Sequence, residues 1–386
     1  MSRIVIVGGG IIGSSAAYHL ARAGCAADVV VVEPDPTYAF AATPRAVGGV
    51  RLQHSVRENV EMSLYGDAVY SAFSEHVTGG KLAYDPQFKR IGYLYQVKGA
   101  RNAELLEADT AMQRSLGVNV EILDRAALRE RYPSFVFDAV DAAALSPDGQ
   151  IDPHGALMGM RSAAEGLGVT YLKDRVVGLD VAGGLVTTAR LEGGGTLPVD
   201  TLVNAANCWA PGICDMVGMA IPIAPMPRHQ FFFDSRADIE VIPAMRGDDG
   251  FAFRPHSLGY LCGHSRPGDP FGFNWEQDHA VFEQELWPRL AERCPAFEAI
   301  KLKGGWVGHY DMNPLDGNMV LDRFHKVPNF ILAAGFSGHG LMHAPAVGRA
   351  IKEIILEGGF QSIDLSRFSY RRMEDNEPIP DQGPRA

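Results

Sequence analysis

Residues 3–33 read RIVIVGGGIIGSSAAYHLARAGCAADVVVVE, two apolar runs separated by a glycine loop and a helical pattern. The first run suits a strand that is buried on both faces. Gly8, Gly10 and Gly13 then allow a tight turn, a close backbone approach to a pyrophosphate and close packing of helix on strand. Glu33 ends the second run, where its carboxylate can accept both ribose hydroxyls of an adenosine. The stretch predicts a dinucleotide-binding unit, and NAD and FAD both fit it.

Composition limits the possible partners. With 386 residues, 46% of them hydrophobic, the chain can form two domains with large cores. The net charge of −11 disfavours nucleic acid and anionic membranes, so we expect a small-molecule substrate. The apolar runs are too short to span a bilayer, and no signal peptide is expected. The five cysteines lack CxxC spacing, which favours free thiols in the cytoplasm over disulfides or a metal site.

A loop rich in small residues follows the second run. Gly48 and Gly49 allow the backbone to approach a flat or anionic group, and Arg51 lies beside them. Ser55 and Glu58 have capping-box spacing, which predicts a helix running from Val56 towards Phe73. A surface loop with a solvated arginine is the alternative interpretation.

The remaining elements follow from periodicity and turn signals. Strand patterns lie at 81–96, 169–172, 176–181, 185–191, 202–209, 231–233, 251–254, 260–263, 304–310 and 330–334, and helix patterns at 102–116, 125–131, 152–168, 278–291 and 344–357. Residues 335–340 form a second glycine loop between a strand and a helix. The last fifteen or so residues are predicted to be a mobile tail.

Two motifs connect this chain with a known family: GGVRLQHSVREN at 48–59 and AAGFSGHGLMHAPAVG at 333–348. With the N-terminal fingerprint, they make the sequence resemble the GGVR-type branch of the D-amino-acid oxidase/sarcosine oxidase (DAO) family of FAD-dependent oxidoreductases. The resemblance implies an α/β (α+β) fold, in which a glutathione-reductase-like, FAD-binding Rossmann domain is interrupted by an antiparallel-sheet substrate domain. The FAD domain would comprise residues 1–85, 145–215 and 325–386, and the substrate domain residues 86–144 and 216–324.

The resemblance also implies a set of residues that bind FAD. These are Gly8, Gly10, Ile11, Ile12, Gly13, Glu33, Thr43, Arg45, Gly48, Gly49, Val176, Ala205, Asn207, Trp209, Gly335, Ser337, Gly338, His339, Gly340 and Leu341. Asn207 stands where the family usually has glycine. The second glycine loop would supply N–H groups to the pyrimidine end of the flavin, where negative charge develops on reduction.

Three departures from the family pattern shape the expected chemistry. The cysteine that bonds covalently to flavin in monomeric sarcosine oxidase is replaced by Gly308, so we expect noncovalent FAD. The lysine associated with oxygen activation is replaced by Leu261, which favours a dye, quinone or partner protein over oxygen as electron acceptor. The lysine that binds the substrate carboxylate is replaced by Met342, and Arg51 is our candidate for that role.

The implied reaction is oxidation of a C–N bond in a secondary amine or an N-substituted or imino amino acid. Hydride would pass to flavin N5, and the imine would be hydrolysed. A D-amino-acid or glycine oxidase or dehydrogenase, a flavoprotein assembly factor without turnover and, if flavin is absent, an NAD-linked dehydrogenase are the alternatives. The expected partners are the small-molecule substrate and an electron acceptor, and an oligomer also fits the sequence.

The candidate site residues lie near the predicted flavin face. Arg51, His264 and Tyr310 are candidates for catalysis, and Arg51, Arg254, Tyr260 and His343 for substrate binding. A packed, hydrogen-bonded role is the alternative for His264. The twelve histidines show no HExxH-like spacing, so no metal site is expected.

Overall fold

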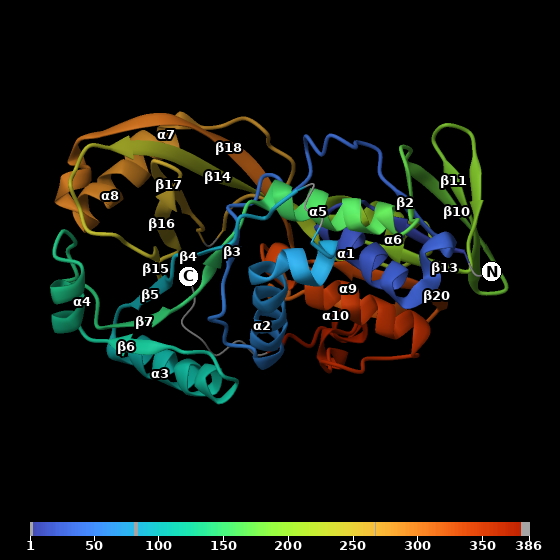
Figure 1. Ribbon diagram of the computed structural model, residues 1–386, viewed down its shortest axis with the longest axis horizontal. Helices are drawn as coiled ribbons and strands as arrows, with labels where there is room; N and C mark the ends of the chain where they lie inside the picture. The colour runs from blue at the N-terminus through green and yellow to red at the C-terminus, as the bar shows by residue number, and fades with distance from the viewer. Residues whose placement is uncertain (1–2, 81–83, 267, 380–386) are drawn as a thin grey trace.

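The computed structural model describes residues 3–80, 84–266 and 268–379. Two large sheets lie side by side, one at the end that holds the N-terminus and one at the opposite end (Figure 1). Segments from both ends of the chain build the first sheet, which is therefore discontinuous in sequence.

The first sheet has six strands in the order β19-β20-β13-β1-β2-β9. Their bounds are β1 Ile4–Val7, β2 Val29–Val32, β9 Thr170–Leu172, β13 Thr201–Asn204, β19 Val320–Phe324 and β20 Val327–Ala334. Strand β1 pairs in parallel with β2 and β13 at the centre, whereas β19 runs antiparallel at the edge. Strands β1 and β2 are fully buried, which explains their apolar sequences.

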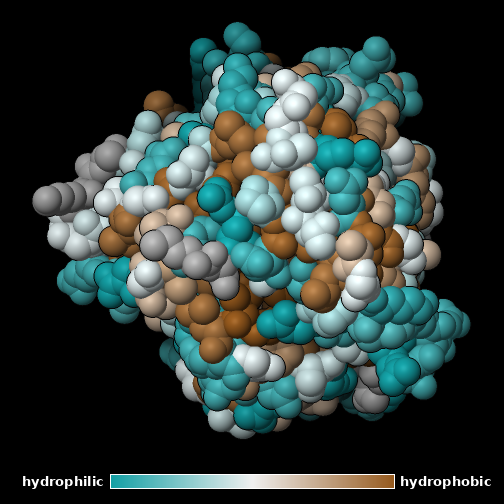
Figure 2. All heavy atoms as spheres, turned by 90° about the vertical axis from the view of Figure 1, so that its right-hand side faces the viewer, coloured by the Kyte–Doolittle hydropathy of each residue, from teal (hydrophilic) through white to brown (hydrophobic). Residues whose placement is uncertain are grey.

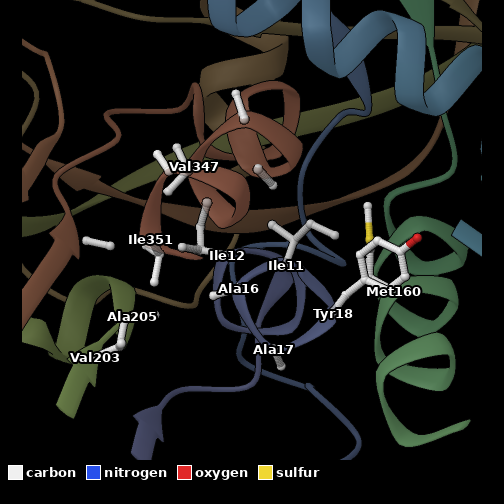
Figure 3. Packing of buried hydrophobic residues seen from close by; sticks show 14 of the residues in the cluster. Ile11, Ile12, Ala16, Ala17, Tyr18, Met160, Val203, Ala205, Val347 and Ile351 are labelled. Atoms are coloured by element: carbon white, nitrogen blue, oxygen red, sulfur yellow. The ribbon is translucent and has the colours of Figure 1, made fainter. Parts of the chain in front are cut away.

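Helices cover one face of this sheet. They are α1 (Ile11–Leu20), α5 (Pro153–Gly166) and α9 (Gly340–Leu356), with α2 (Arg57–Ser71) packed on α9. Figure 3 shows Ile12 and Ala16 of α1 beside Val347 and Ile351 of α9, with Ile11 on the side of α1 that faces Met160 of α5. The small residues of α1 therefore allow the close helix packing that the glycine fingerprint requires.

Shorter elements cover the opposite face. They are β10 (Val176–Ala182), β11 (Leu185–Leu191), β12 (Thr196–Pro198) and α6 (Ala210–Asp215). Helix α10 (Arg371–Glu374) packs near the sheet edge, where Tyr370 contacts Phe324. The surface at this end of the molecule mixes hydrophilic and hydrophobic residues instead of presenting one continuous patch (Figure 2).

The second sheet has eight strands in the order β18-β14-β17-β16-β15-β5-β7-β6. Their bounds are β5 Tyr93–Val97, β6 Glu121–Leu123, β7 Ala142–Ser146, β14 Ala224–Ser235, β15 Ala244–Gly247, β16 Phe251–His256, β17 Gly259–His264 and β18 Ile300–Met312. Helices α3 (Ala100–Ser115), α4 (Arg125–Arg131), α7 (His279–Val281) and α8 (Trp287–Arg293) surround it. Apart from the parallel pairing of β15 with β5, its neighbouring strands are antiparallel.

The two faces of the larger sheet differ in chemistry because successive side chains in a strand point to opposite sides. One face carries an apolar core that includes Leu94, Met245, Phe253 and Cys262. The other face carries polar and small residues from β5, β15, β16, β17, β14 and β18: Tyr93, Tyr95, Arg246, Ala252, Arg254, Leu261, Gly263, Arg228, Gln230, Gly308 and Tyr310. This polar face is turned towards the nucleotide domain.

A small three-stranded sheet joins the two domains. It contains β3 (Gly49–Val50), β8 (Gly149–Gln150) and β4 (Lys89–Arg90). Gly48 precedes it with φ +80°, and a Cβ there would lie 2.1 Å from the carbonyl oxygen of Ile151. The glycine is therefore required both by the backbone conformation and by the close approach of the next chain segment.

Several local predictions were wrong. The strand expected at 202–209 ends at Asn204, because 207–209 form a helical turn. The capping box does not form: α2 has no side-chain cap, since Ser55 donates to Asp109 and Glu58 accepts from Arg367. Strands β15 and β19 were not anticipated. Of the strand expected at 81–96, residues 81–83 lie outside the described residues.

The expected C-terminal tail is also partly structured. Arg372 is buried, forms an ion pair with Asp316 and donates to the carbonyl of Met319 at 2.7 Å. Residues 380–386 lie outside the described residues. The position of β19 in the six-stranded sheet places the last domain boundary before Val320, earlier than the expected residue 325. Among the described residues, no helix has the length and apolar character needed to cross a membrane.

Candidate functional site

A cavity of about 1360 Å³ lies between the polar face of the larger sheet and the carboxyl ends of the central strands of the smaller one. It extends from the N-terminus of α1 to Tyr93 and Tyr95 of β5. Its length and mixed polar lining suit an elongated ligand plus a smaller molecule.

At one end of the cavity, the glycine loop and Glu33 form a nucleotide-binding arrangement. Gly10 is the N-cap of α1, and the N–H of Ile11 donates to Thr43 Oγ1 at 3.3 Å. Glu33 accepts hydrogen bonds from the N–H groups of Gly9 (2.8 Å) and Asp35 (2.9 Å). Burial raises the pKa of Glu33 despite these bonds. The carboxylate is thereby fixed in orientation at the cavity wall.

Most of the predicted cofactor residues line this cavity. They are Gly8, Gly10, Ile11, Ile12, Glu33, Thr43, Arg45, Gly48, Gly49, Val176, Ala205, Asn207, Trp209, Ser337, Gly338, His339, Gly340 and Leu341. Gly13 and Gly335 do not line it and act through packing instead. A Cβ on Gly13 would lie 1.9 Å from the carbonyl oxygen of Gly8, so this position holds helix and strand together.

The second glycine loop is held by a carboxylate that sequence reasoning missed. Asp311 of β18 accepts hydrogen bonds from the N–H groups of Gly335 (2.7 Å) and Phe336 (3.1 Å). Burial raises its pKa to about 6. A lone aspartate in a strand pattern gives no sequence signal for this role. Its effect is to fix the loop against the larger sheet.

Arg45 connects the loop before α2 with β18. Its Nη1 donates to the carbonyl of Val307 at 2.8 Å, and its own carbonyl accepts from Trp306 Nε1 at 2.7 Å. A Cβ on Gly308 would lie 3.2 Å from the Arg45 carbonyl oxygen, so this position has little room for a side chain.

Arg51 faces the cavity near the second glycine loop. Its Nη1 donates to the carbonyl of Gln53 at 2.6 Å, and its Nη2 lies 2.8 Å from His339 Nε2. Gln53 in turn donates to the carbonyls of Tyr93 and Ala144 and to Ser146 Oγ. The arginine is therefore ordered by the substrate domain and does not extend into solvent, which contradicts the alternative of a solvated surface loop.

Two buried histidines, His54 and His343, and the half-buried His339 cluster beside this arginine. Burial, and next the positive charge of Arg51, hold the pKa of His54 and of His339 well below the usual range and lower that of His343 to about 3. His54 and His343 both contact Ser63 Oγ. His343 does not line the cavity, and its ring is buried against Ser63. The prediction that His343 binds substrate is therefore wrong.

The structure brings Tyr310 and Arg254 to the same cavity. Both lie on the polar face and line the cavity. The Tyr310 ring packs against Gly338, where a Cβ would lie 2.5 Å from the ring, and the Arg228 guanidinium lies 5.1 Å from its centroid. Arg254 approaches Gly49 of β3. Their roles in catalysis and binding stay predictions.

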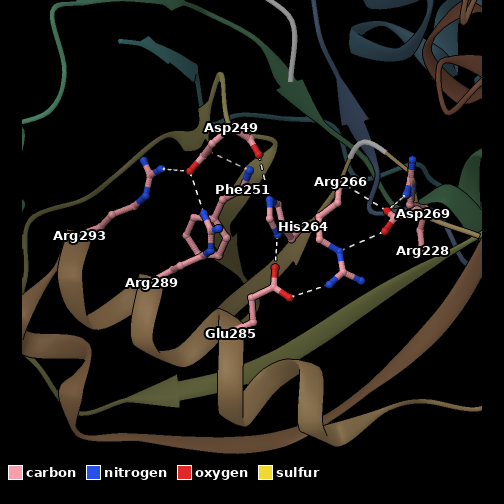
Figure 4. Close-up of polar contacts among 9 residues, drawn as sticks. All are labelled: Arg228, Asp249, Phe251, His264, Arg266, Asp269, Glu285, Arg289 and Arg293. Atoms are coloured by element: carbon pink, nitrogen blue, oxygen red, sulfur yellow. Dashed lines mark hydrogen bonds and ion pairs between the residues drawn. The ribbon is translucent and has the colours of Figure 1, made fainter.

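Tyr260 lies on the opposite face of the sheet, whereas His264, at the end of β17, borders the cavity. Tyr260 packs on Phe233 and Phe297 and does not line the cavity, so its predicted contact with substrate is wrong. His264 is held between Glu285 and the carbonyl of Asp249 (Figure 4). Both ring nitrogens are engaged, which favours the packed, hydrogen-bonded interpretation over a catalytic one.

The comparison with known families decides the class of this protein. The family model described as FAD dependent oxidoreductase (DAO) matches residues 3–354. The chain belongs to this family. FAD-dependent oxidoreductase domain-containing protein 1 of Xenopus laevis is 34% identical, covering 97% of this chain and 83% of that protein.

Two further relatives have names that state an activity. The 4-methylaminobutanoate oxidase (formaldehyde-forming) of Paenarthrobacter nicotinovorans is 27% identical over 97% of this chain, which spans 46% of that protein. The crystal structure of L-proline dehydrogenase from P. horikoshii superimposes with a TM-score of 0.87 at 25% identity, covering 98% of this chain and 99% of that one. These matches support the predicted fold class.

The cavity fits the FAD that this family uses. An alanine Cβ at Gly10 would have Thr43 Oγ1, at 3.8 Å, as its nearest neighbour, so glycine leaves space beside the α1 N-terminus for a diphosphate. Asn207 Oδ1, on the cavity wall, is buried without a hydrogen-bond partner among the described residues. An acceptor of this kind suits a donor group of the cofactor.

Proposed function

We propose that this DAO-family protein oxidises a C–N bond of an amino acid that carries a secondary amine. Noncovalently bound FAD supplies the chemistry by accepting a hydride from the carbon next to nitrogen. The substrate nitrogen lone pair forms the new C=N bond. Water then adds to the imine, and breakage of the C–N bond releases a carbonyl compound and an amine.

The observation that carries this proposal is the group of cationic and phenolic side chains on the polar face of the larger sheet. Arg246 and Arg254 lie there with Tyr93 and Tyr95, opposite the second glycine loop. Guanidinium groups pair well with carboxylates through two parallel hydrogen bonds. The placement therefore favours a substrate that carries a carboxylate.

The same charges assist the chemistry. Hydride loss needs a neutral amine, because its lone pair must form the new double bond. Positive groups disfavour a second positive charge nearby, so the guanidinium of Arg51 and its neighbours lower the pKa of a bound substrate ammonium. The histidines beside Arg51 are neutral and add no charge. This chain therefore promotes amine deprotonation through its electrostatics.

The relatives support a secondary amine in particular. Their names indicate 4-methylaminobutanoate and L-proline, which are both secondary amines with a carboxylate. We therefore consider secondary amines better candidate substrates than primary D-amino acids and glycine.

Anaerobic stopped-flow mixing tests the proposal. Purified holoprotein is mixed with N-alkyl amino acids, N-(carboxyalkyl) amino acids, cyclic imino acids, glycine and D-amino acids, and flavin absorbance is followed. Rapid bleaching by secondary amines, with a carbonyl product trapped by hydrazine, is expected. Bleaching by primary amino acids alone would favour a D-amino-acid or glycine oxidase. Intact flavin absorbance with every compound would favour a non-catalytic flavoprotein.

A further inference from the structure

Three guanidinium groups surround one phenol at the substrate end of the cavity. Arg51 comes from the loop before α2, Arg246 from β15 and Arg254 from β16, and each acts electrostatically on Tyr93. The strand register places Arg246 beside Tyr95 and Ala252, on the same face as Arg254. Positive charge from three separate chain segments is thus concentrated in one place.

Arg254 lacks the partners that a buried arginine normally has. It is 7% exposed, and its Nε and Nη2 have no hydrogen-bond partner among the described residues. Burial lowers its pKa to about 10, which still leaves it protonated at neutral pH. A buried charge without a partner costs several kcal/mol, so these donors call for an anion.

The neighbours of Arg246 do not neutralise its positive charge. The structure shows no hydrogen bond or ion pair between it and another described residue, and its electrostatic neighbours are Tyr93, Tyr95, Tyr310 and Asp249. Burial raises the pKa of Tyr93 and of Tyr95, which keeps both phenols protonated. Asp249 is the acid among these neighbours.

The nearby carboxyl groups are already engaged. Asp249 pairs with Arg289 at 3.0 Å and with Arg293 at 2.9 Å on α8 (Figure 4). Asp148 accepts from Leu52 and Ser146, and burial raises its pKa to about 7. On the α3 side, Asp109 accepts from Ser55. The protein therefore leaves more positive than negative charge here.

One carboxylate does not account for this charge. Arg51, together with His339, borders the second glycine loop, where a substrate carboxylate beside the flavin would lie. Arg246 and Arg254 lie on the sheet, and Arg254 has two buried donors still free among the described residues. Arg246 and Arg254 lie on the sheet that forms one wall of the cavity, whereas Arg51 lies on a loop at its edge. The two sheet arginines can therefore bind a second anionic group.

We propose that the substrate is a dicarboxylic secondary amine, an N-(carboxyalkyl) amino acid with one carboxylate on each side of the nitrogen. Arg51 binds one carboxylate, and Arg246 and Arg254 bind the other. This inference rests on the proposed C–N oxidation and specifies its substrate class. The amine between the two carboxylates lies among cationic groups, which favour its neutral form.

Binding of inert analogues tests the inference without turnover. Thiodiacetate is a dianion in which sulfur replaces the amine, and (methylthio)acetate is the matching monoanion. Titration of the FAD-loaded protein, followed by flavin difference absorbance and calorimetry at fixed ionic strength, should show thiodiacetate binding about 30-fold tighter, the effect of one charge-assisted hydrogen-bonded pair. Arg246→Gln and Arg254→Gln should each remove most of this preference while retaining FAD and (methylthio)acetate binding.

Arg289→Gln is the matched control, because it removes one positive charge from the far side of the same sheet. The Arg289→Gln protein should still bind thiodiacetate more tightly than (methylthio)acetate. Equal binding of the two analogues, or loss of FAD instead of dianion preference in the Arg254→Gln protein, would overturn the inference. Dianion preference without bleaching by any amine would uphold this site and reject the proposed oxidation. Bleaching by monocarboxylic amines without dianion preference would uphold the proposed oxidation and reject the second carboxylate site.

Discussion

The carboxylate of Asp148 accepts a hydrogen bond from the backbone N–H of Leu52 at 2.9 Å, across ninety-six positions of sequence. Ser146 donates to the other carboxylate oxygen. Together with Gln53, which donates to Ser146 Oγ at 2.7 Å, these bonds hold the loop that carries Arg51 against β5 and β7. The candidate carboxylate-binding arginine is thus positioned by a buried acid.

Asp148→Asn should make stability less dependent on pH. Burial raises the pKa of Asp148 from 3.8 to about 7, so the unfolded chain releases this proton at lower pH than the folded one. The wild-type free energy of unfolding should therefore fall, relative to the variant, by about 1.4 kcal/mol per pH unit between these two values and stay constant above them. Asparagine can still accept from Leu52 and donate to Ser146.

Urea unfolding of both FAD-loaded proteins between pH 4.5 and 8.5 measures this difference. The variant should gain stability over wild type up to about pH 7, by about 4 kcal/mol at most over the whole shift. A difference that is the same at all pH values would mean that Asp148 is ionised in the folded protein.

Two glycine substitutions should separate cofactor binding from folding. Gly10→Ala places a methyl group in the cavity with Thr43 Oγ1, at 3.8 Å, as its nearest neighbour, and should retain the fold while weakening FAD binding about tenfold or more. Gly48→Ala puts a Cβ 2.1 Å from the Ile151 carbonyl oxygen at a positive φ and should destabilise the protein by about 2 kcal/mol or more. FAD titration and circular dichroism distinguish the outcomes. A Gly10→Ala protein that binds FAD as tightly as wild type would contradict the assignment of the diphosphate to the α1 N-terminus.

The flavin should be released by acid. Gly308 has no side chain, and the Arg45 carbonyl oxygen lies 3.2 Å from where its Cβ would be, so the covalent link known from monomeric sarcosine oxidase cannot form there. Precipitation with trichloroacetic acid should leave free FAD in the supernatant, identified by chromatography. Flavin that stays with the pellet after washing would reveal attachment through another residue.

Features whose residues lie close together in the sequence could be predicted, and features that depend on distant strand pairing could not. The GxGxxG loop could be predicted because its three glycines and Glu33 follow one another within one βαβ unit. By contrast, Arg246 was missed because β15 spans only Ala244–Gly247, too short for alternation to be recognised. Its role becomes visible only through pairing with β5, about 150 positions earlier.

Tertiary contacts also overrode signals that looked clear. Ser55 and Glu58 have the spacing of a capping box, but their side chains bind Asp109 and Arg367 instead. Tyr260 and His264 were expected to face the cavity; strand alternation places Tyr260 on the far side of the sheet, and His264 borders the cavity with its ring held by Glu285 and the Asp249 carbonyl. Predicting a side-chain face requires the register of a strand, which the sequence of that strand alone does not contain.

Leu261→Lys should increase reactivity with oxygen. Leu261 lies on the polar face, directly across the strand pairing from Arg254, at the position where the resemblance places an oxygen-activating lysine. We expect the wild-type reduced flavin to react slowly with oxygen and faster with a dye or quinone, and a cation here to stabilise developing superoxide. Reoxidation rates with oxygen and with phenazine methosulfate measure both effects, with Leu261→Met as the uncharged control. Rapid peroxide formation by wild type would contradict the expectation.

Arg51→Ala should weaken substrate binding and spare the fold. Arg51 borders the second glycine loop, and its Nη2 contacts His339 while its Nη1 donates to the Gln53 carbonyl. Gln53 and Leu52 keep their own bonds to the sheet and to Asp148, so the loop should stay in place without the guanidinium. Loss of a charge-assisted pair with the substrate carboxylate should cost about 2–4 kcal/mol of binding free energy.

Arg51→Lys serves as the companion variant, because it keeps the charge but loses the planar two-point geometry. It should bind (methylthio)acetate with an affinity between those of wild type and Arg51→Ala, at unchanged FAD content. Flavin difference titrations with the three proteins give the comparison. Wild-type affinity in the Arg51→Ala protein, with its flavin spectrum intact, would transfer the first carboxylate to Arg254 and show that Arg51 only orders the histidines behind it.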